Sequence, residues 1–273
     1  MTRNKASLPT RVLTGTLLLI LSAVALFPFV YMLLTSFTQA TILGFGFNFK
    51  ELSLINYVHV FVNFDFFTGL KNSIIVSALS CIFNCLIASM AAYGFAKKKF
   101  PGNHFLYFFY IVTLMIPGQV TLIPVFTMMR QMHMLNTYQA LVFPILNAFG
   151  VFLIKQFMSA VPDDLLEAAD IDGCIEIKKY LYIVLPLIQP VLVSLTIFTF
   201  VTSWNDFLWP LVISTDPSMR TLTLALSVLK GNYTTNYGLV MAGSVLTFLP
   251  PFLLYIFLQK QFVEGIALSG IKG

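Results

Sequence analysis

Charged side chains are scarce in this sequence. Only 10% of its 273 residues are charged, 58% are hydrophobic, and the mean hydropathy is +0.86. Soluble domains carry about 25% charged residues, and a chain this apolar cannot hide its side chains in a core surrounded by water. The scarcity of charge therefore excludes a soluble domain and predicts an integral membrane protein.

Residues that usually carry catalysis or bind metals are also few and dispersed. The three histidines lie in separate loops without the spacing of a zinc site, and the three cysteines give no disulfide framework. There is no Gly-x-Ser-x-Gly elbow, and the stretch from Gly265 to Lys272 lacks the Lys-Ser/Thr of a phosphate-binding loop. We therefore expect no catalytic centre, metal or nucleotide site in this chain. Cys81 and Cys85 are expected to be buried in a span as small apolar residues.

Six apolar runs are long enough to cross a bilayer, which takes roughly 20 residues. In the third run, Pro117, Gly118 and Pro124 predict a kink or an unwound turn, and we favour a kink packed by neighbouring helices. The run Leu222–Leu229 is too short to span. The first run is too long for a signal peptide, so it is expected to be retained after a polar tail of residues 1–11. The predicted spans are Val12–Phe37, Leu70–Ala96, Phe105–Met129, Tyr138–Met158, Leu187–Trp204 and Tyr237–Phe262.

The Lys and Arg residues are unevenly distributed over the segments that connect these spans. If both termini are cytoplasmic, eleven of the sixteen lie inside and five outside, as the positive-inside rule requires. The net charge of +5 is scattered over loop ends, which does not indicate a nucleic-acid partner. The distribution predicts a multi-pass membrane protein with both termini in the cytoplasm.

The longest strongly polar stretch runs from Val161 to Pro190. Pro162 suits the first turn of a helix, and the two aspartates after it suit the positive N-terminal end. Gly173 is expected to end this helix, and a second short helix is expected over residues 175–182. Pro186 is expected to start the chain again into an apolar segment. The stretch is thus predicted to form two short helices that meet at a glycine corner outside the membrane.

The first of these helices carries a face suited to a protein partner. Leu165, Ala168, Ala169 and Asp172 fall on neighbouring positions, and the two alanines leave room for another surface to approach. Glu167 lies at the edge of this face, where its carboxylate can accept a charge-assisted hydrogen bond from a partner.

Polar residues inside the spans are costly in lipid, so they are candidates for function. The best cluster is Trp204, Asn205 and Asp206 at the outer end of the fifth span, because an indole face with amide and carboxylate partners suits a polyhydroxyl ligand. Asn147 in the fourth span is a further candidate for a substrate path. The same residues could instead anchor the helix at the membrane interface or bond to a neighbouring helix. In the sixth span, Gly238 and Ala242 are typical of close helix packing.

Three stretches resemble one known family. Glu167-Ala168-Ala169, Asp172-Gly173 and Leu185-Pro186 resemble the EAA loop of permease subunits in bacterial ABC importers. Two further stretches, from Ser203 to Pro210 and from Gly265 to Gly273, resemble the carbohydrate-uptake branch. This branch is the maltose-permease-G-like subfamily of the binding-protein-dependent transport inner-membrane component family. The resemblance covers the chain from about Val12 onward.

The resemblance implies an all-α, type I ABC importer (MetI-like) permease fold with six transmembrane helices. It implies a permease domain over residues 12–273 in a bacterial cytoplasmic membrane, with an EAA loop at 161–186 that docks on an ATPase subunit. The implied partners are a larger homologous permease subunit, two ATPase subunits and an extracytoplasmic sugar-binding protein. ATP and Mg²⁺ would be held by the ATPase subunits, so this chain would need no cofactor and would not be an enzyme. The implied coupling residues are Glu167, Ala168, Ala169, Asp172, Gly173 and Pro186.

Two alternatives differ in cargo or in class. A member of the same family could carry a polyol or glycerol phosphate, although the basic residues of the spans (Lys71, Lys155 and Lys260) lie near span ends and none lies deep inside to neutralise a phosphate. A secondary carrier or a membrane-embedded enzyme would need buried ionisable residues, which the spans almost lack. The composition therefore favours a neutral sugar as cargo.

Overall fold

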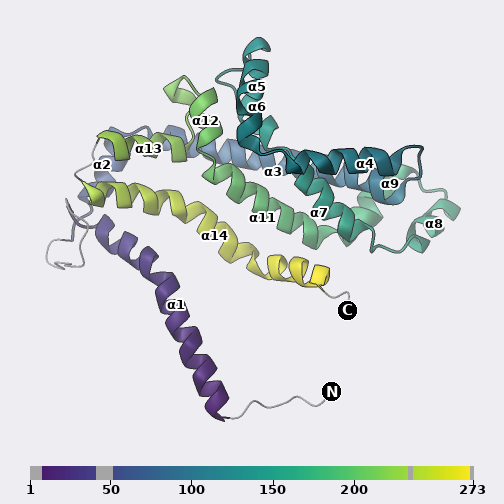
Figure 1. Cartoon of the computed structure of the whole chain (residues 1–273), viewed down its shortest axis with the longest axis horizontal. Helices are drawn as coiled ribbons and strands as arrows, with labels where there is room; N and C mark the ends of the chain where they lie inside the picture. The colour runs from purple at the N-terminus through teal and green to yellow at the C-terminus, as the bar shows by residue number, and fades with distance from the viewer. Residues whose placement is uncertain (1–7, 41–51, 233–235, 271–273) are drawn as a thin grey trace. The chain divides into compact units, whose positions relative to one another are not determined.

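The computed structural model describes residues 8–40, 52–232 and 236–270. Every regular element in these residues is helical, in agreement with the expected all-α fold (Figure 1). The chain divides into two compact units, one formed by residues 1–65 and 226–248 and the other by residues 66–225 and 249–273. The tail motif Gly265–Gly273 lies at the end of the last helix, where residues 271–273 and the side chains from 261 onward are outside the described set.

Three helices are long and apolar enough to cross a membrane without a break. They are α1 (Leu8–Ser36), α3 (Phe66–Lys97) and α14 (Tyr237–Gly270). Each begins and ends within a few residues of a predicted span, except that α14 continues beyond Phe262. Three bent helix pairs are also long and apolar enough, which gives up to six spans, the predicted number.

The bends are sharper than the sequence indicated. The third predicted span is formed by α4 (Asn103–Val112), η2 (Thr113–Met115) and α5 (Gly118–Gln131), and it turns by 101°. The predicted break at Pro117 and Gly118 is confirmed as an unwound turn, whereas the simple kink that was favoured is wrong. Pro117 has extended backbone angles and no N–H group, so the helix stops before it and α5 starts in a new direction.

The fourth predicted span is also broken, which the sequence analysis did not predict. It is formed by α6 (Tyr138–Val142), η3 (Phe143–Ile145) and α7 (Ala148–Met158), with a bend of 48°. Asn147 has extended backbone angles, and its side-chain oxygen accepts a hydrogen bond from the Phe149 N–H at 3.0 Å. Asn147 therefore begins a new helix, because Asn competes for local backbone groups and favours the N-cap position.

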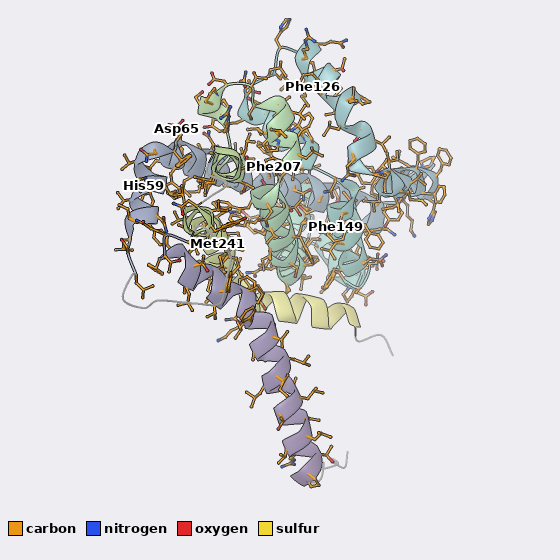
Figure 2. All side chains as sticks on the ribbon, turned by 60° about the vertical axis from the view of Figure 1, so that its left-hand side comes forward. His59, Asp65, Phe126, Phe149, Phe207 and Met241 are labelled. Carbon is orange, nitrogen blue, oxygen red and sulfur yellow. The ribbon has the colours of Figure 1, made fainter. Side chains whose placement is uncertain are left out.

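In the first unit, α2 (Ile55–Asn63) fastens the end of α1 and the start of α14. The buried Asn56 side chain donates hydrogen bonds to the carbonyls of Ser36 at 2.9 Å and Thr38 at 2.8 Å. The sequence did not resolve this helix within the segment 38–68, of which residues 41–51 lie outside the described set. Along α1 the apolar side chains project around the ribbon, and Leu19 is 73% exposed, as expected of a helix that faces lipid (Figure 2).

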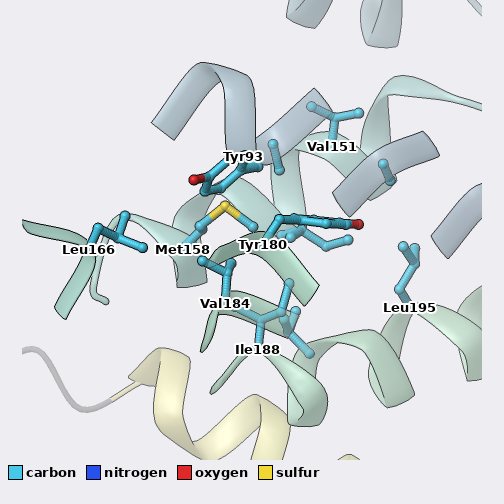
Figure 3. Close-up of a cluster of buried hydrophobic side chains, with 12 residues drawn as sticks. Tyr93, Val151, Met158, Leu166, Tyr180, Val184, Ile188 and Leu195 are labelled. Atoms are coloured by element: carbon cyan, nitrogen blue, oxygen red, sulfur yellow. The ribbon is translucent and has the colours of Figure 1, made fainter. Parts of the chain in front are cut away.

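In the second unit, α3 is the central helix and packs against α7 and α11 (Gln189–Asn205). Their shared core contains Ala88, Val151, Val191 and Leu195, and the close-up in Figure 3 shows this cluster. A Cβ added to Gly150 would lie 3.0 Å from the Cβ of Ala88, so the small residue permits the close approach of α7 to α3.

The remaining elements of the second unit are short. The expected burial of Cys81 and Cys85 on α3 is confirmed for Cys81, while Cys85 is partly buried, and both contact the backbone of α11. After α11 come α12 (Leu208–Ile213) and η5 (Pro217–Met219). The next helix, α13 (Leu222–Asn232), belongs to the first unit from Leu226 onward and is too short to span, as predicted.

We expect Gly238→Ala to destabilise the first unit. A Cβ at this position would lie 1.8 Å from the Thr38 carbonyl oxygen and 2.7 Å from the Asn56 side-chain nitrogen. Backbone would have to move, and such overpacking costs roughly 1–3 kcal/mol. The measurement is the thermal unfolding of the purified chain in detergent. Gly15→Ala is the control, because nothing lies within 4 Å of the corresponding Cβ. Equal melting temperatures for the two variants would contradict the close approach.

Candidate functional site

The polar segment of residues 161–186, called here the coupling segment, forms a helical corner. Helix α8 (Asp164–Ile171) ends before Gly173, whose φ is +72°, and α9 (Glu176–Lys179) follows. The Cys174 N–H donates to the Ala169 carbonyl at 2.9 Å and closes the turn. Left-handed backbone of this kind favours glycine, so the predicted glycine corner is confirmed.

The boundaries of the two short helices differ from the expectation. Pro162 lies before the helix, because α8 begins at Asp164 with Asp163 as its N-cap residue. The second helix does not end before Pro186. It continues from α9 through η4 (Tyr180–Val184) and α10 (Leu185–Leu187), and Pro186 occupies the first turn of α10, where a missing N–H is tolerated. The chain then bends by 77° into α11.

The two alanines of α8 do not form one exposed face. Glu167, Ala168 and Asp172 are exposed, whereas Ala169 is only 8% exposed and Leu166 equally little. Residues three apart share a side of a helix, so Ala169 follows Leu166 toward the core of this chain. The expectation that both alanines face a partner was therefore wrong for Ala169.

Three isoleucines make the coupling segment apolar on its surface. Ile171 is 88% exposed, Ile175 59% and Ile177 52%, and all three flank the Gly173 corner. Our sequence analysis missed them, although branched apolar residues within a polar loop were a usable signal. If the segment lies outside the membrane, as the sequence predicts, such exposed apolar side chains are typical of a protein–protein contact.

The start of the coupling segment is fastened to the end of α3. The Lys97 side chain is 3% exposed, and its ammonium donates to the Val161 carbonyl at 2.5 Å and to the Asp163 carboxylate at 2.6 Å. This hydrogen bond and the positive charge of Lys97 hold the pKa of the Asp163 carboxyl below its ordinary value. The sequence analysis counted Lys97 only as one of the basic residues that set the membrane orientation, and it did not predict this contact.

A second set of charges holds α8 and α9 together. The Lys179 side chain is 2% exposed, and its ammonium lies 2.5 Å from carboxylate oxygens of both Asp170 and Glu176. Glu176 also pairs with Lys98 at 2.5 Å and accepts a hydrogen bond from the Tyr93 hydroxyl at 2.9 Å. Buried ammonium groups need such partners, because an unpaired charge away from water is costly.

A cavity of about 430 Å³ lies in the second unit, at the bends of the third and fourth spans. Helix α5, η3, the end of α11 and the start of α12 supply its lining. A smaller cavity of about 80 Å³ adjoins it through Ile145 and Thr202, which line both. The larger cavity holds Asn205 and Asp206, and the smaller one holds Asn147. The other polar and aromatic lining residues are Gln119, Thr121, Thr202 and Trp209 in the larger cavity and Asn84, Phe149, Phe198, Thr199 and Thr202 in the smaller.

Asp206 is held at the edge of the larger cavity by the backbone of α12. Its carboxylate accepts a hydrogen bond from the Trp209 N–H at 3.3 Å, while the Trp209 indole N–H donates to the Ala140 carbonyl at 2.8 Å. Burial raises the pKa of Asp206, and the backbone N–H groups of Trp209 and Leu208 partly oppose this rise. The Asn205 side chain is exposed and donates to the Val201 carbonyl at 2.9 Å.

Trp204 does not share this position. It is 1% exposed, stacks on Phe200 with 5.4 Å between ring centroids, and lines neither cavity. We had expected the Trp204 indole to meet a ligand beside Asn205. This expectation does not fit the structure, because Trp204 is buried against other residues of this chain and does not face either cavity. The aromatic residue of the larger cavity is Trp209, which the sequence analysis did not single out as a site residue.

These features suit binding and conformational change better than bond-breaking chemistry. The larger cavity offers amide, hydroxyl, carboxylate and indole groups, which together can bind a polar ligand that also has apolar faces. Among the described residues, no three His, Cys, Asp or Glu side chains lie close enough to hold a metal ion.

Comparison with known proteins places these features in a family. The profile of the "Binding-protein-dependent transport system inner membrane component" family matches residues 84–267, which include α7, the coupling segment and α11. The match covers more than half of the chain and both parts of the site.

Two relatives are similar over nearly the whole length. The arabinooligosaccharides transport system permease protein AraQ of Halalkalibacterium halodurans is 35% identical over 257 residues, which are 92% of this chain and 92% of the relative. The lactose transport system permease protein LacG of Rhizobium radiobacter is 31% identical over 250 residues, 91% of each chain.

A solved structure supports the fold. One chain of a bacterial ABC transporter involved in the import of the acidic polysaccharide alginate aligns with a TM-score of 0.80, at 22% identity, over 95% of this chain and 98% of that one. This chain thus has the fold of that transporter chain. With the family match and relatives above 30% identity, this chain belongs to the family of binding-protein-dependent transport system inner membrane components.

Proposed function

We propose that this chain is the permease subunit of an ATP-driven importer of neutral oligosaccharides, with the larger cavity as part of the cargo path. The observation that carries the proposal is the position of this cavity at the helix breaks, lined by neutral polar groups and an indole. Broken helices at membrane depth are tolerated where they line a water-filled path or are covered by protein. The relatives AraQ and LacG, named for arabinooligosaccharides and lactose, support a sugar as the cargo.

The charge of the lining supports a neutral sugar over an acidic one. None of the described residues that line either cavity is Lys or Arg, and Asp206 contributes a carboxylate. A uronate or phosphate would meet no positive partner there and one negative neighbour, and like charges in close contact disfavour binding. Hydroxyl groups of a neutral sugar can pair with the amides of Gln119 and Asn205, while an apolar sugar face can lie on Trp209.

The partners follow from the same proposal. A larger permease subunit completes the path, two ATPase subunits hold ATP and Mg²⁺ and bind the coupling segments, and an extracytoplasmic sugar-binding protein delivers the cargo. The family description supports the binding protein, and the isoleucine-flanked corner at Gly173 supports the ATPase contact. Both termini and the coupling segment are then cytoplasmic, and this chain itself hydrolyses nothing.

Single-cysteine labelling tests the orientation. In a background without the three native cysteines, Lys178→Cys should react only with reagents that enter the cytoplasm, and Ser218→Cys with impermeant reagents from outside. Both side chains are exposed, on opposite sides of the predicted topology. External labelling at residue 178 would refute the coupling role, because no cytoplasmic ATPase could reach the segment.

Substitutions at two adjacent alanines distinguish an effect on ATPase docking from an effect on folding. Ala168→Trp should leave the subunit stable but reduce co-purification of the ATPase at least about tenfold, equivalent to ~1.4 kcal/mol, because the bulk lies on the exposed side of α8. Ala169→Trp should instead lower the thermal stability of this subunit, since Ala169 is buried. Normal ATPase binding by a folded Ala168→Trp variant would contradict docking on this surface.

Uptake measurements test the cargo path. Asn205→Ala should lower the ratio kcat/KM for oligosaccharide uptake about fivefold, because a ligand hydroxyl loses one hydrogen bond, whose net contribution is about 0.5–1.5 kcal/mol. Gln189→Ala is the matched control, because Gln189 is exposed at the other end of α11. The complex should remain assembled in both variants.

Asp206→Asn tests the preference for a neutral cargo. Asn keeps an acceptor for the Trp209 N–H and removes the negative charge. We expect acidic oligosaccharides to compete with neutral ones more strongly in this variant than in the wild type. Uptake kinetics unchanged by Asn205→Ala, together with efficient acidic uptake by the wild type, would overturn the proposed path and cargo.

A further inference from the structure

One face of α3 carries a row of polar contacts to the coupling segment. Ser89, Tyr93 and Lys97 recur every four residues and therefore share one side of the helix. Ser89 shares a hydrogen bond of 2.7 Å with the hydroxyl of Tyr180, Tyr93 donates to Glu176, and Lys97 reaches the start of the segment. The row therefore reaches both the start and the end of the coupling segment.

The ion pairs of Lys97 in this row and of Lys179 in α9 differ from ordinary surface ion pairs, because the lysine of each pair is buried. Exposed pairs contribute little because water screens them, but the side chains of Lys97 and Lys179 are 3% and 2% exposed. Around the charges, Tyr93 packs on Tyr180 with 5.6 Å between ring centroids, and Met158 and Leu166 belong to the same buried cluster (Figure 3). The carboxylate partners Asp163, Asp170 and Glu176 are 54–72% exposed, so in each pair the lysine is the buried member, and its loss removes the group that ties the two elements together.

Helix α3 itself is suited to move without bending. It has 32 residues, no proline and no break, so at ~1.5 Å per residue it is about 48 Å long. The neighbouring spans of the second unit are bent by 101°, 48° and 77°. Kinks need an identifiable cause such as proline, and α3 contains none.

We propose that α3 and the coupling segment move as one body during transport, and that Lys97, Lys98 and Lys179 are the positioning residues that fasten them. Lys97 fixes the start of the segment, Lys98 fixes α9, and Lys179 fixes α8 to α9. When the corner at Gly173 is displaced, α3 then moves with it, because the coupling segment does not deform. This inference rests on the proposed function, because it assumes that an ATPase displaces the corner.

A distance measurement tests the single body directly. Nitroxide labels at Lys99→Cys and Asp164→Cys, in a background without native cysteines, report the distance between the end of α3 and α8. In the complete complex, this distance should be the same without nucleotide and with ATP trapped. A shift larger than the width of the distance distribution would show that the segment moves independently, and would overturn the proposal.

Charge reversal tests the positioning residues. Lys97→Glu should lower the amount of sugar transported per ATP hydrolysed at least about fivefold, within the usual range of coupling energies, while the ATPase still co-purifies. Lys99→Glu is the matched control, because it makes the same change of charge at the exposed lysine two residues further on. The double variant Lys97→Glu with Asp163→Lys restores an opposite pair and should recover most of the lost coupling.

The outcomes separate this inference from the proposed function. If the wild-type complex shows no ATP-driven sugar uptake, the proposed function fails. If the wild type transports sugar but Lys97→Glu transports it with unchanged stoichiometry, only the inference fails. Loss of coupling without recovery in the double variant would also overturn it, because the ion pair would then not be the cause.

Discussion

A helix that breaks within a membrane leaves backbone N–H and C=O groups without partners, and this constraint shapes the second unit. Three of its spans are bent, and at two of the breaks the residues respond in different ways: Pro117 removes a donor, and Asn147 supplies an acceptor for the Phe149 N–H. The cavities lie at these same breaks. Broken helices are tolerated where they border a water-filled space, so under the proposed function the cavity that accompanies the breaks would also be the space open to a cargo.

The scarcity of charged residues also affects how strongly the cavity could bind a cargo. A path lined by amides, hydroxyls and one indole binds weakly at each contact, since a net hydrogen bond contributes only about 0.5–1.5 kcal/mol. Weak contacts suit a transporter, because the cargo must leave the site as readily as it enters. Energy for directed transport then has to come from another polypeptide, and the charged residues of this chain are concentrated where such a partner would act, around the coupling segment.

Local chemistry made some features predictable from the sequence. The Gly173 corner and the long apolar runs follow from single residues and from length, and the structure agrees with both. The sequence did not predict which side of a helix packs against a neighbouring helix. Ala169 is buried and Trp204 lies away from the cavity because α8 and α11 are oriented by packing against other helices, which no local pattern in α8 or α11 specifies. Lys97 was misread for the same reason: its partners lie 64 and 66 residues away in the chain.

The two ends of α3 suggest how a local displacement becomes a change of access. At the end opposite the coupling segment, the buried Asn72 donates to the carbonyls of Ser218 at 2.8 Å and Arg220 at 2.9 Å, and the Leu222 N–H donates to the Ser73 hydroxyl at 2.8 Å. These bonds join α3 to the segment after α12, the helix that carries Trp209 into the cavity. A rigid α3 cannot shift at one end without pulling on the other. Under the proposed function, a displacement of α3 would therefore reach the cavity through α12 and Trp209.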